Sequence, residues 1–115
     1  MIITRTPYRV SLFGGGTDHR EYYEKYNGAV LSFTIDKYCY ISTRELPPFF
    51  NHKIRAVYSK IELANKAQDI SHPAIRAALL KYAPNLALEI QHHGDLPAQS
   101  GVGSSSAFEI GRAHV

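Results

Sequence analysis

The sequence contains a single cysteine, Cys39, and no tryptophan. One thiol cannot close an internal disulfide, so packing and hydrogen bonds have to hold the fold, as they do in cytoplasmic proteins. Long hydrophobic runs are also missing, since charged or polar residues interrupt each one well before the roughly 18 residues of a membrane span. The first residues lack the apolar stretch of a secretory signal. We therefore expect a cytoplasmic protein with no membrane partner.

A strong charge of one sign is absent as well. Thirteen basic and 10 acidic side chains give a formal net charge of +3, with no block of like charge. Nucleic-acid-binding domains gather their basic residues on one face, so this scatter argues against a nucleic-acid partner. An anionic small molecule suits the mild excess equally well. At 115 residues the chain is long enough for one core and too short for two ordinary domains.

Residue patterns along the chain predict a mixed set of elements. Strands are expected over residues 2–13, 29–35, 38–45, 54–58 and 86–91, with residues 36–37 as a two-residue hairpin loop. Helices are expected over residues 19–26, capped by Thr17 or Asp18, and from Ser71 to Tyr82. Residues 61–70 fit neither period and are expected to be a loop with some helix. The packed face of the second helix is expected to carry Ile75, Leu79, Leu80 and Tyr82, and that of the first Tyr22, Tyr23 and Tyr26.

A glycine- and serine-rich stretch, residues 100–106, follows the last expected strand and precedes residues that begin another helix. Free backbone N–H groups at a helix start form an anion site where small residues keep side chains away. The stretch lacks the lysine of a Walker A loop and the third glycine of a Rossmann turn. Taken alone, it is also compatible with a solvated loop.

Two stretches carry a family resemblance. The run Pro97-Ala98-Gln99-Ser100-Gly101-Val102-Gly103-Ser104-Ser105-Ser106-Ala107 resembles the nucleotide-phosphate loop of the GHMP small-molecule kinases. The run Pro7-Tyr8-Arg9-Val10-Ser11-Leu12-Phe13-Gly14-Gly15-Gly16-Thr17-Asp18 resembles that family's first motif. The triple glycine and the tyrosine-rich segment after it are most similar to the heptose 7-phosphate kinase branch, with fucokinases nearby.

The resemblance implies the α+β, ribosomal protein S5 domain 2-like fold of the family's N-terminal domain. It implies transfer of the γ-phosphoryl group of ATP to a sugar or sugar-phosphate hydroxyl, with D-glycero-D-manno-heptose 7-phosphate as the favoured acceptor and Mg²⁺ as cofactor. The implied phosphate-binding residues are Ser100, Gly101, Val102, Gly103, Ser104, Ser105 and Ser106, with Ser105 and then Ser106 as Mg²⁺ ligands. The implied substrate-binding residues are Arg9, Gly15, Gly16, Thr17 and Asp18.

Some alternatives stay open at this stage. Asp18 is equally a helix cap, and Arg9 could pair with a carboxylate or serve the turn. Fucokinase and galactokinase-like sugar kinases are alternatives within the family, and an S5-like RNA-binding module or a non-catalytic sugar sensor are alternatives outside its chemistry.

The extent of the resemblance defines two segments. We expect residues 1–108 to be an incomplete GHMP kinase N-terminal domain, whose missing C-terminal half carries the catalytic aspartate. No catalytic residue is therefore expected in this chain, and we expect it to be inactive alone. Residues 109–115, EIGRAHV, match a reading frame of a common sequencing adapter and are expected to be a non-native tail.

Overall fold

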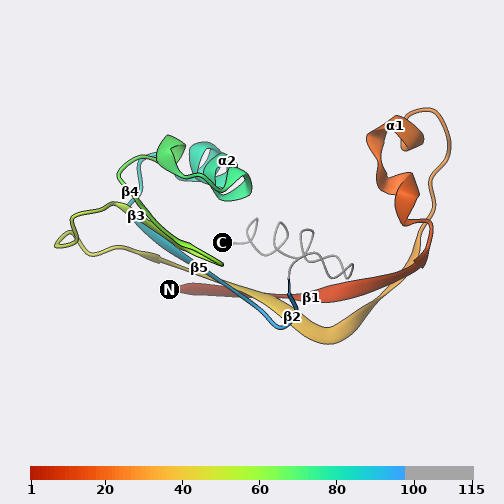
Figure 1. Cartoon of the computed structure of the whole chain (residues 1–115), viewed down its shortest axis with the longest axis horizontal. Coiled ribbons are helices and arrows are strands. Elements are labelled where there is room, and N and C mark those ends of the chain that lie inside the picture. The colour runs from red at the N-terminus through yellow and green to blue at the C-terminus, as the bar shows by residue number, and fades with distance from the viewer. Residues whose placement is uncertain (98–115) are drawn as a thin grey trace.

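The computed structural model describes residues 1–97 (Figure 1). Five strands form one sheet in the order β1-β2-β5-β3-β4. Their bounds are Ile2–Phe13 for β1, Leu31–Glu45 for β2, Ile54–Val57 for β3, Ile61–Ala64 for β4 and Leu88–Gly94 for β5. All neighbouring pairs are antiparallel except β3 and β5, which run parallel. The same residues also form two 3-10 helices, η1 (Gly15–Asp18) and η2 (Ala67–Asp69), and two α-helices, α1 (Arg20–Tyr23) and α2 (Pro73–Tyr82).

The two ends of the molecule differ in how they pack. Helix α2 lies over β3 and β5 at one end, while β1 and β2 extend as a curved ribbon that carries η1 and α1 at the other (Figure 1). We call residues 9–34 the arm, and β3, β4, η2, α2 and β5 together the packed end. A buried cluster holds the packed end together: Ile54, Ala56, Ala67, Ile70, Ile75 and Leu79. Helix α1 in the arm buries none of its residues.

Strand β2 differs from the prediction of a hairpin with a loop at residues 36–37. It is continuous from Leu31 to Glu45 and pairs with β1 along its length. The register passes from Pro7–Tyr38 to Arg9–Thr34, so residues 35–37 of β2 lie opposite Tyr8 alone as a bulge. The polar pair that resembles a turn therefore marks an irregularity inside a strand, and the expected hairpin was wrong.

Helix α1 is also shorter than the expected helix over residues 19–26. Its N-cap is His19, and no side chain caps it, so the expected cap at Thr17 or Asp18 was wrong. Tyr22, Tyr23 and Tyr26 are 42%, 53% and 63% exposed, so they form no packed face. Within residues 1–97 no strand or helix besides η1 packs against α1, and helical stability depends mainly on such packing.

Predictions at the packed end came closer to the structure. Helix α2 has Pro73 in its first turn, although its N-cap is His72 rather than Ser71, and His72 Nδ1 accepts a hydrogen bond from the Ile75 N–H at 3.3 Å. Its buried residues are Ile75, Ala78 and Leu79, whereas Leu80 and Tyr82 are exposed. The segment of residues 61–70 is β4 followed by η2, and β5 begins two residues later than expected and runs to Gly94.

Glu89 organises the charges on the sheet face opposite α2. Its carboxylate accepts hydrogen bonds from Arg44 Nε at 3.1 Å and from Arg55 Nη1 at 2.9 Å. Burial raises the pKa of Glu89, and the hydrogen bonds and charges of the two arginines outweigh that effect and hold it below its ordinary value. The carboxylate therefore stays ionised between its partners. No helix within residues 1–97 is both long and apolar enough to span a bilayer.

Candidate functional site

The turn after β1 is fixed by two close backbone approaches. Gly14 adopts φ +90°, and a Cβ there would lie 2.0 Å from the Ala29 carbonyl oxygen. Thr17 Oγ1 donates to the carbonyl oxygens of Gly14 at 2.7 Å and Ala29 at 3.2 Å. A Cβ on Gly28 would meet the Thr17 side chain at 3.0 Å. Glycine is therefore needed at position 14, because only bare backbone with a positive φ can approach Ala29 this closely, and at position 28 a side chain would fit only if Thr17 shifted slightly.

A cleft of about 310 Å³ opens beside this turn. It is lined by Thr17, Asp18, Tyr23, Gly28, Ala29 and Val30. The Asp18 side chain is exposed and makes no hydrogen bond or ion pair with any other residue of positions 1–97. The carboxylate therefore does not cap α1, and its two acceptor oxygens remain available to hydroxyl donors at the cleft.

The predicted substrate-binding residues do not all meet at this cleft. Thr17 and Asp18 line it, whereas Gly15 and Gly16 belong to the same turn but are not among its lining residues. A Cβ built on either glycine meets nothing within 4 Å, so both face open space. Arg9 lies within β1, where Nη1 donates to Ser11 Oγ at 2.8 Å, and no carboxylate of the described chain pairs with it. The alternative of an Arg9–carboxylate pair thus finds no partner in this part of the chain.

Tyr23 is a cleft residue that sequence reasoning missed. The expected helix assigned it to a packed face, but it is 53% exposed and lines the cleft together with Asp18. Its spacing of five residues from Asp18 gave no signal, because Asp18 ends η1 and Tyr23 ends α1, with a bend at His19 between the two helices.

The end of β5 approaches β1 close to the first motif. The Asp95 N–H donates to the Tyr38 carbonyl at 3.0 Å, and the Tyr38 N–H donates to Asp95 Oδ2 at 2.7 Å. Leu96 packs against the buried cluster of Tyr8, Cys39 and Ile41. Burial raises the pKa of the Cys39 thiol to about 11, which keeps it protonated and agrees with its expected packing role. Leu96 thus lies against Tyr8 of the first motif, the residue that precedes Arg9. The predicted phosphate-binding residues, Ser100 to Ser106, lie outside the described residues.

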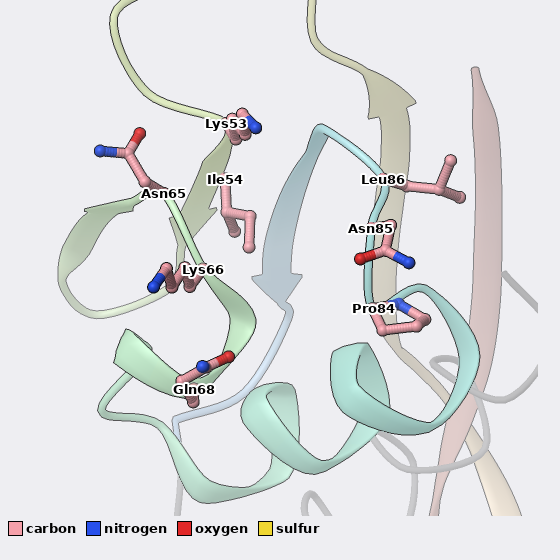
Figure 2. A pocket seen from close by; sticks show the side chains of 8 residues that line it. All are labelled: Lys53, Ile54, Asn65, Lys66, Gln68, Pro84, Asn85 and Leu86. Carbon is pink, nitrogen blue, oxygen red and sulfur yellow. The ribbon is translucent and has the colours of Figure 1, made fainter.

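A second cavity of about 370 Å³ lies at the packed end (Figure 2). Asn65, Lys66 and Gln68 lie on one side of it and Pro84, Asn85 and Leu86 on the other, with Lys53 and Ile54 between them. It contains none of the residues that the two motifs single out, and it lies at the opposite end of the sheet from η1. We therefore place the candidate site at the Thr17–Asp18 cleft.

Comparison with known proteins gives matches along nearly the whole chain. The chain is 33% identical to the D-glycero-alpha-D-manno-heptose 7-phosphate kinase of Campylobacter jejuni, over 96% of its own length and 35% of the relative's. Its structure superposes with a TM-score of 0.78 on a D-glycero-D-manno-heptose 1-phosphate kinase from Bacteroides thetaiotaomicron, at 22% identity, covering 97% of this chain and 40% of the other. The predicted resemblance to the N-terminal part of the GHMP small-molecule kinases is confirmed.

A mevalonate kinase from Methanococcus jannaschii has the same fold, with a TM-score of 0.65 at 23% identity, over 96% of this chain and 38% of the other. No family model matches the chain. The prediction of an α+β GHMP kinase N-terminal domain is confirmed by these neighbours. The chain spans about 35% of the length of the curated relative that it matches.

Proposed function

We propose that this chain is the N-terminal part of an ATP-dependent sugar kinase whose acceptor is D-glycero-D-manno-heptose 7-phosphate, phosphorylated at the anomeric oxygen. The observation that carries the proposal is the unpartnered Asp18 carboxylate in the cleft at the family's first motif. The 33% identity to a heptose 7-phosphate kinase favours this acceptor over fucose, galactose or mevalonate.

The residues of the first motif take distinct roles in this proposal. Asp18 accepts hydrogen bonds from a pair of sugar hydroxyls, and the Thr17 hydroxyl holds the turn that presents it. Gly15 and Gly16 let a sugar approach bare backbone, since no neighbour occupies the space in front of them. Arg9 is assigned to the phosphate that the acceptor already carries. Such a reaction needs mainly positioning and charge neutralisation from the protein.

The nucleotide is assigned to the second motif. Residues Ser100 to Ser106 would hold the phosphates of ATP through backbone N–H groups, and the hydroxyls of Ser105 and Ser106 would complete the shell of Mg²⁺, which prefers oxygen ligands. The described structure ends at Pro97, and just before it Asp95 bonds to Tyr38 and Leu96 packs against the cluster that contains Tyr8 of the first motif. We further propose that residues 109–115 are not native. If the codons for these residues differ from the adapter sequence, this proposal is refuted.

The proposal is tested by a coupled assay of ADP release, carried out with the protein encoded by the complete reading frame. The acceptors are heptose 7-phosphate, fucose, galactose and mevalonate. We expect the complete protein to phosphorylate heptose 7-phosphate. We expect no turnover from the 115-residue chain, because the family's catalytic aspartate is expected in the C-terminal half. No ADP release with any acceptor would refute the kinase. Sugar binding without turnover would indicate the sensor alternative, and salt-sensitive RNA binding the S5-like module.

Asp18→Asn gives the assay a residue-level test. Loss of the charge should raise KM for the sugar about tenfold and leave KM for ATP unchanged, because a charge-assisted hydrogen bond is about twice as strong as a neutral one. Asp69→Asn is the matched control, since Asp69 is also the last residue of a 3-10 turn, at the packed end. An equal effect of both substitutions would remove Asp18 from the sugar site.

A further inference from the structure

The cavity at the packed end lies where three segments of the chain meet at one end of the sheet (Figure 2). Ile54 pairs with Ala64 in the β3–β4 hairpin and with Leu88 of β5, so Lys53 and Asn65 flank the same end of the hairpin. Residues 84–86, which join α2 to β5, form the wall opposite Asn65. The cavity is therefore enclosed by residues that are far apart in the sequence.

Backbone hydrogen bonds and the core hold these walls in place. The Lys53 N–H donates to the Ala64 carbonyl at 3.1 Å, and the Lys53 carbonyl accepts from the Leu88 N–H at 2.9 Å. Ile54, which is 2% exposed, belongs both to the lining of the cavity and to the buried cluster. The cavity thus has a fixed frame, and its volume of about 370 Å³ is within the range of small-molecule sites.

The polar side chains that line this cavity are not used by the fold. Two are lysines and three are carboxamides: Lys53, Asn65, Lys66, Gln68 and Asn85. None of these side chains makes a hydrogen bond or an ion pair with another residue of positions 1–97. Glu62, on the same hairpin, instead accepts hydrogen bonds from three donors of the packed end. The polar groups at the cavity are therefore available to a molecule from solution.

We propose that this cavity binds a small phosphate ester that carries several hydroxyl groups. The two ammonium groups supply compact positive charge for the phosphate. The carboxamides offer donors and acceptors together, which hydroxyl groups require. Among the described residues no carboxylate lines the cavity, so nothing there opposes an anion. The cavity and the Thr17–Asp18 cleft lie at opposite ends of the sheet, and the proposal does not depend on the proposed function.

Isothermal titration calorimetry of the protein encoded by the complete reading frame tests the proposal, with glucose 6-phosphate, inorganic phosphate and glucose as probes. We expect glucose 6-phosphate to bind more tightly than inorganic phosphate, and both to bind more tightly than glucose. Lys53→Gln and Lys66→Gln should each weaken glucose 6-phosphate binding about tenfold, because each removes a charge-assisted hydrogen bond.

Lys60→Gln is the matched control. Lys60 is also exposed and makes no ion pair within residues 1–97, but it lies in the turn at the other end of the β3–β4 hairpin. Its substitution should leave the affinity unchanged. Since all three lysines are exposed, none of the variants should shift the melting temperature by more than about 2 °C. Equal affinities in Lys60→Gln and Lys66→Gln, or no saturable binding of glucose 6-phosphate, would overturn the proposal.

Two further variants locate the ligand and define its class. Asn85→Ala should weaken glucose 6-phosphate binding about fivefold and leave inorganic phosphate binding unchanged, because the carboxamide is assigned to the hydroxyl groups. Asp18→Asn should change neither affinity. Loss of probe binding in Asp18→Asn would place the probe at the cleft and overturn the proposal, and equal affinities for the two phosphates would overturn the assignment to a hydroxyl-bearing ester. A wild type that binds glucose 6-phosphate in this way but consumes no ATP would refute the proposed function instead.

Discussion

The packed end and the arm use their hydrophobic residues in opposite ways. At the packed end Ile75 of α2 and Ile54 of β3 are 1% and 2% exposed and belong to one buried cluster. In the arm Leu12 and Phe13 are 59% and 67% exposed, and the α1 residues Tyr22 and Tyr23 are 42% and 53% exposed. Hydrogen bonds between β1 and β2 and the glycine turn hold the arm, whereas burial holds the packed end. The proposed sugar site therefore lies where the chain is not packing against itself, and its side chains are free for a ligand.

The largest expected effect comes from replacing one hydrophobic side chain by alanine in each of the two regions and comparing the losses of unfolding free energy. Ile75→Ala should cost roughly 2–5 kcal/mol of unfolding free energy, because it leaves a cavity in the buried cluster. Leu12→Ala should cost less than about 0.5 kcal/mol, as exposed positions do. Urea unfolding of the 115-residue chain, followed by circular dichroism, measures both values. Similar costs would show that the arm has a core of its own.

A second test uses the acid sensitivity of the packed end. The backbone N–H of Ser71 donates to Glu62, as do the Tyr58 hydroxyl and the His72 N–H, and these bonds lower the pKa of Glu62 from 4.5 to about 2. A lowered carboxyl pKa contributes stability that is complete above pH 4.5 and is lost as the pH falls toward 2.

Glu62→Gln should therefore lose about 2 kcal/mol at neutral pH, the size expected for hydrogen bonds to a charged group. Its unfolding free energy should also fall less steeply than that of wild type between pH 4.5 and 2. Denaturant titrations across this range measure both effects. Glu24→Gln is the control in the arm, where the ion pair with Arg20 is exposed and contributes little. Parallel curves for wild type and Glu62→Gln would remove Glu62 from this role.

The same contrast explains how far the sequence could predict the fold. Periodicity located β3 and α2 well, because apolar residues there face a core, and Pro73 marks the first turn. It failed over residues 29–45, where the pair Asp36-Lys37 looks like a hairpin loop but lies in a bulge opposite Tyr8. Local turn chemistry cannot distinguish a loop from a bulge when the partner strand is 20 or more residues away in sequence.

The candidate site was predictable to a different degree. The first motif gave Thr17 and Asp18, which line one cleft, and it gave the glycine turn. It gave no role for Gly28 and Gly94, because both act through the atoms of distant residues, Thr17 and Tyr8, which only the folded chain brings near. Whether Arg9 belongs with Asp18 stays a prediction, since its described contact is with Ser11.

The smallest expected effect concerns Tyr23, and it tests whether an exposed aromatic side chain in the arm serves a ligand. Ligand pockets are lined mainly by apolar and aromatic side chains with a few polar groups, and a phenol ring beside the Asp18 carboxylate matches the apolar face and the hydroxyls of a sugar. Under the proposed function, Tyr23→Ala should raise KM for the sugar about tenfold, or 1.4 kcal/mol, with KM for ATP unchanged.

Tyr22→Ala is the control for this substitution, because Tyr22 lies on the same helix but contacts Tyr26, at a ring-centroid distance of 5.3 Å, and does not line the cleft. Tyr23→Phe keeps the ring and should retain most of the affinity if the ring supplies the contact. Neither alanine substitution should change the melting temperature by more than about 2 °C, since both side chains are largely exposed. An equal loss of sugar affinity in Tyr22→Ala and Tyr23→Ala would mean that the helix as a whole, rather than the cleft, supports binding, and the arm would then be a structural element like the packed end.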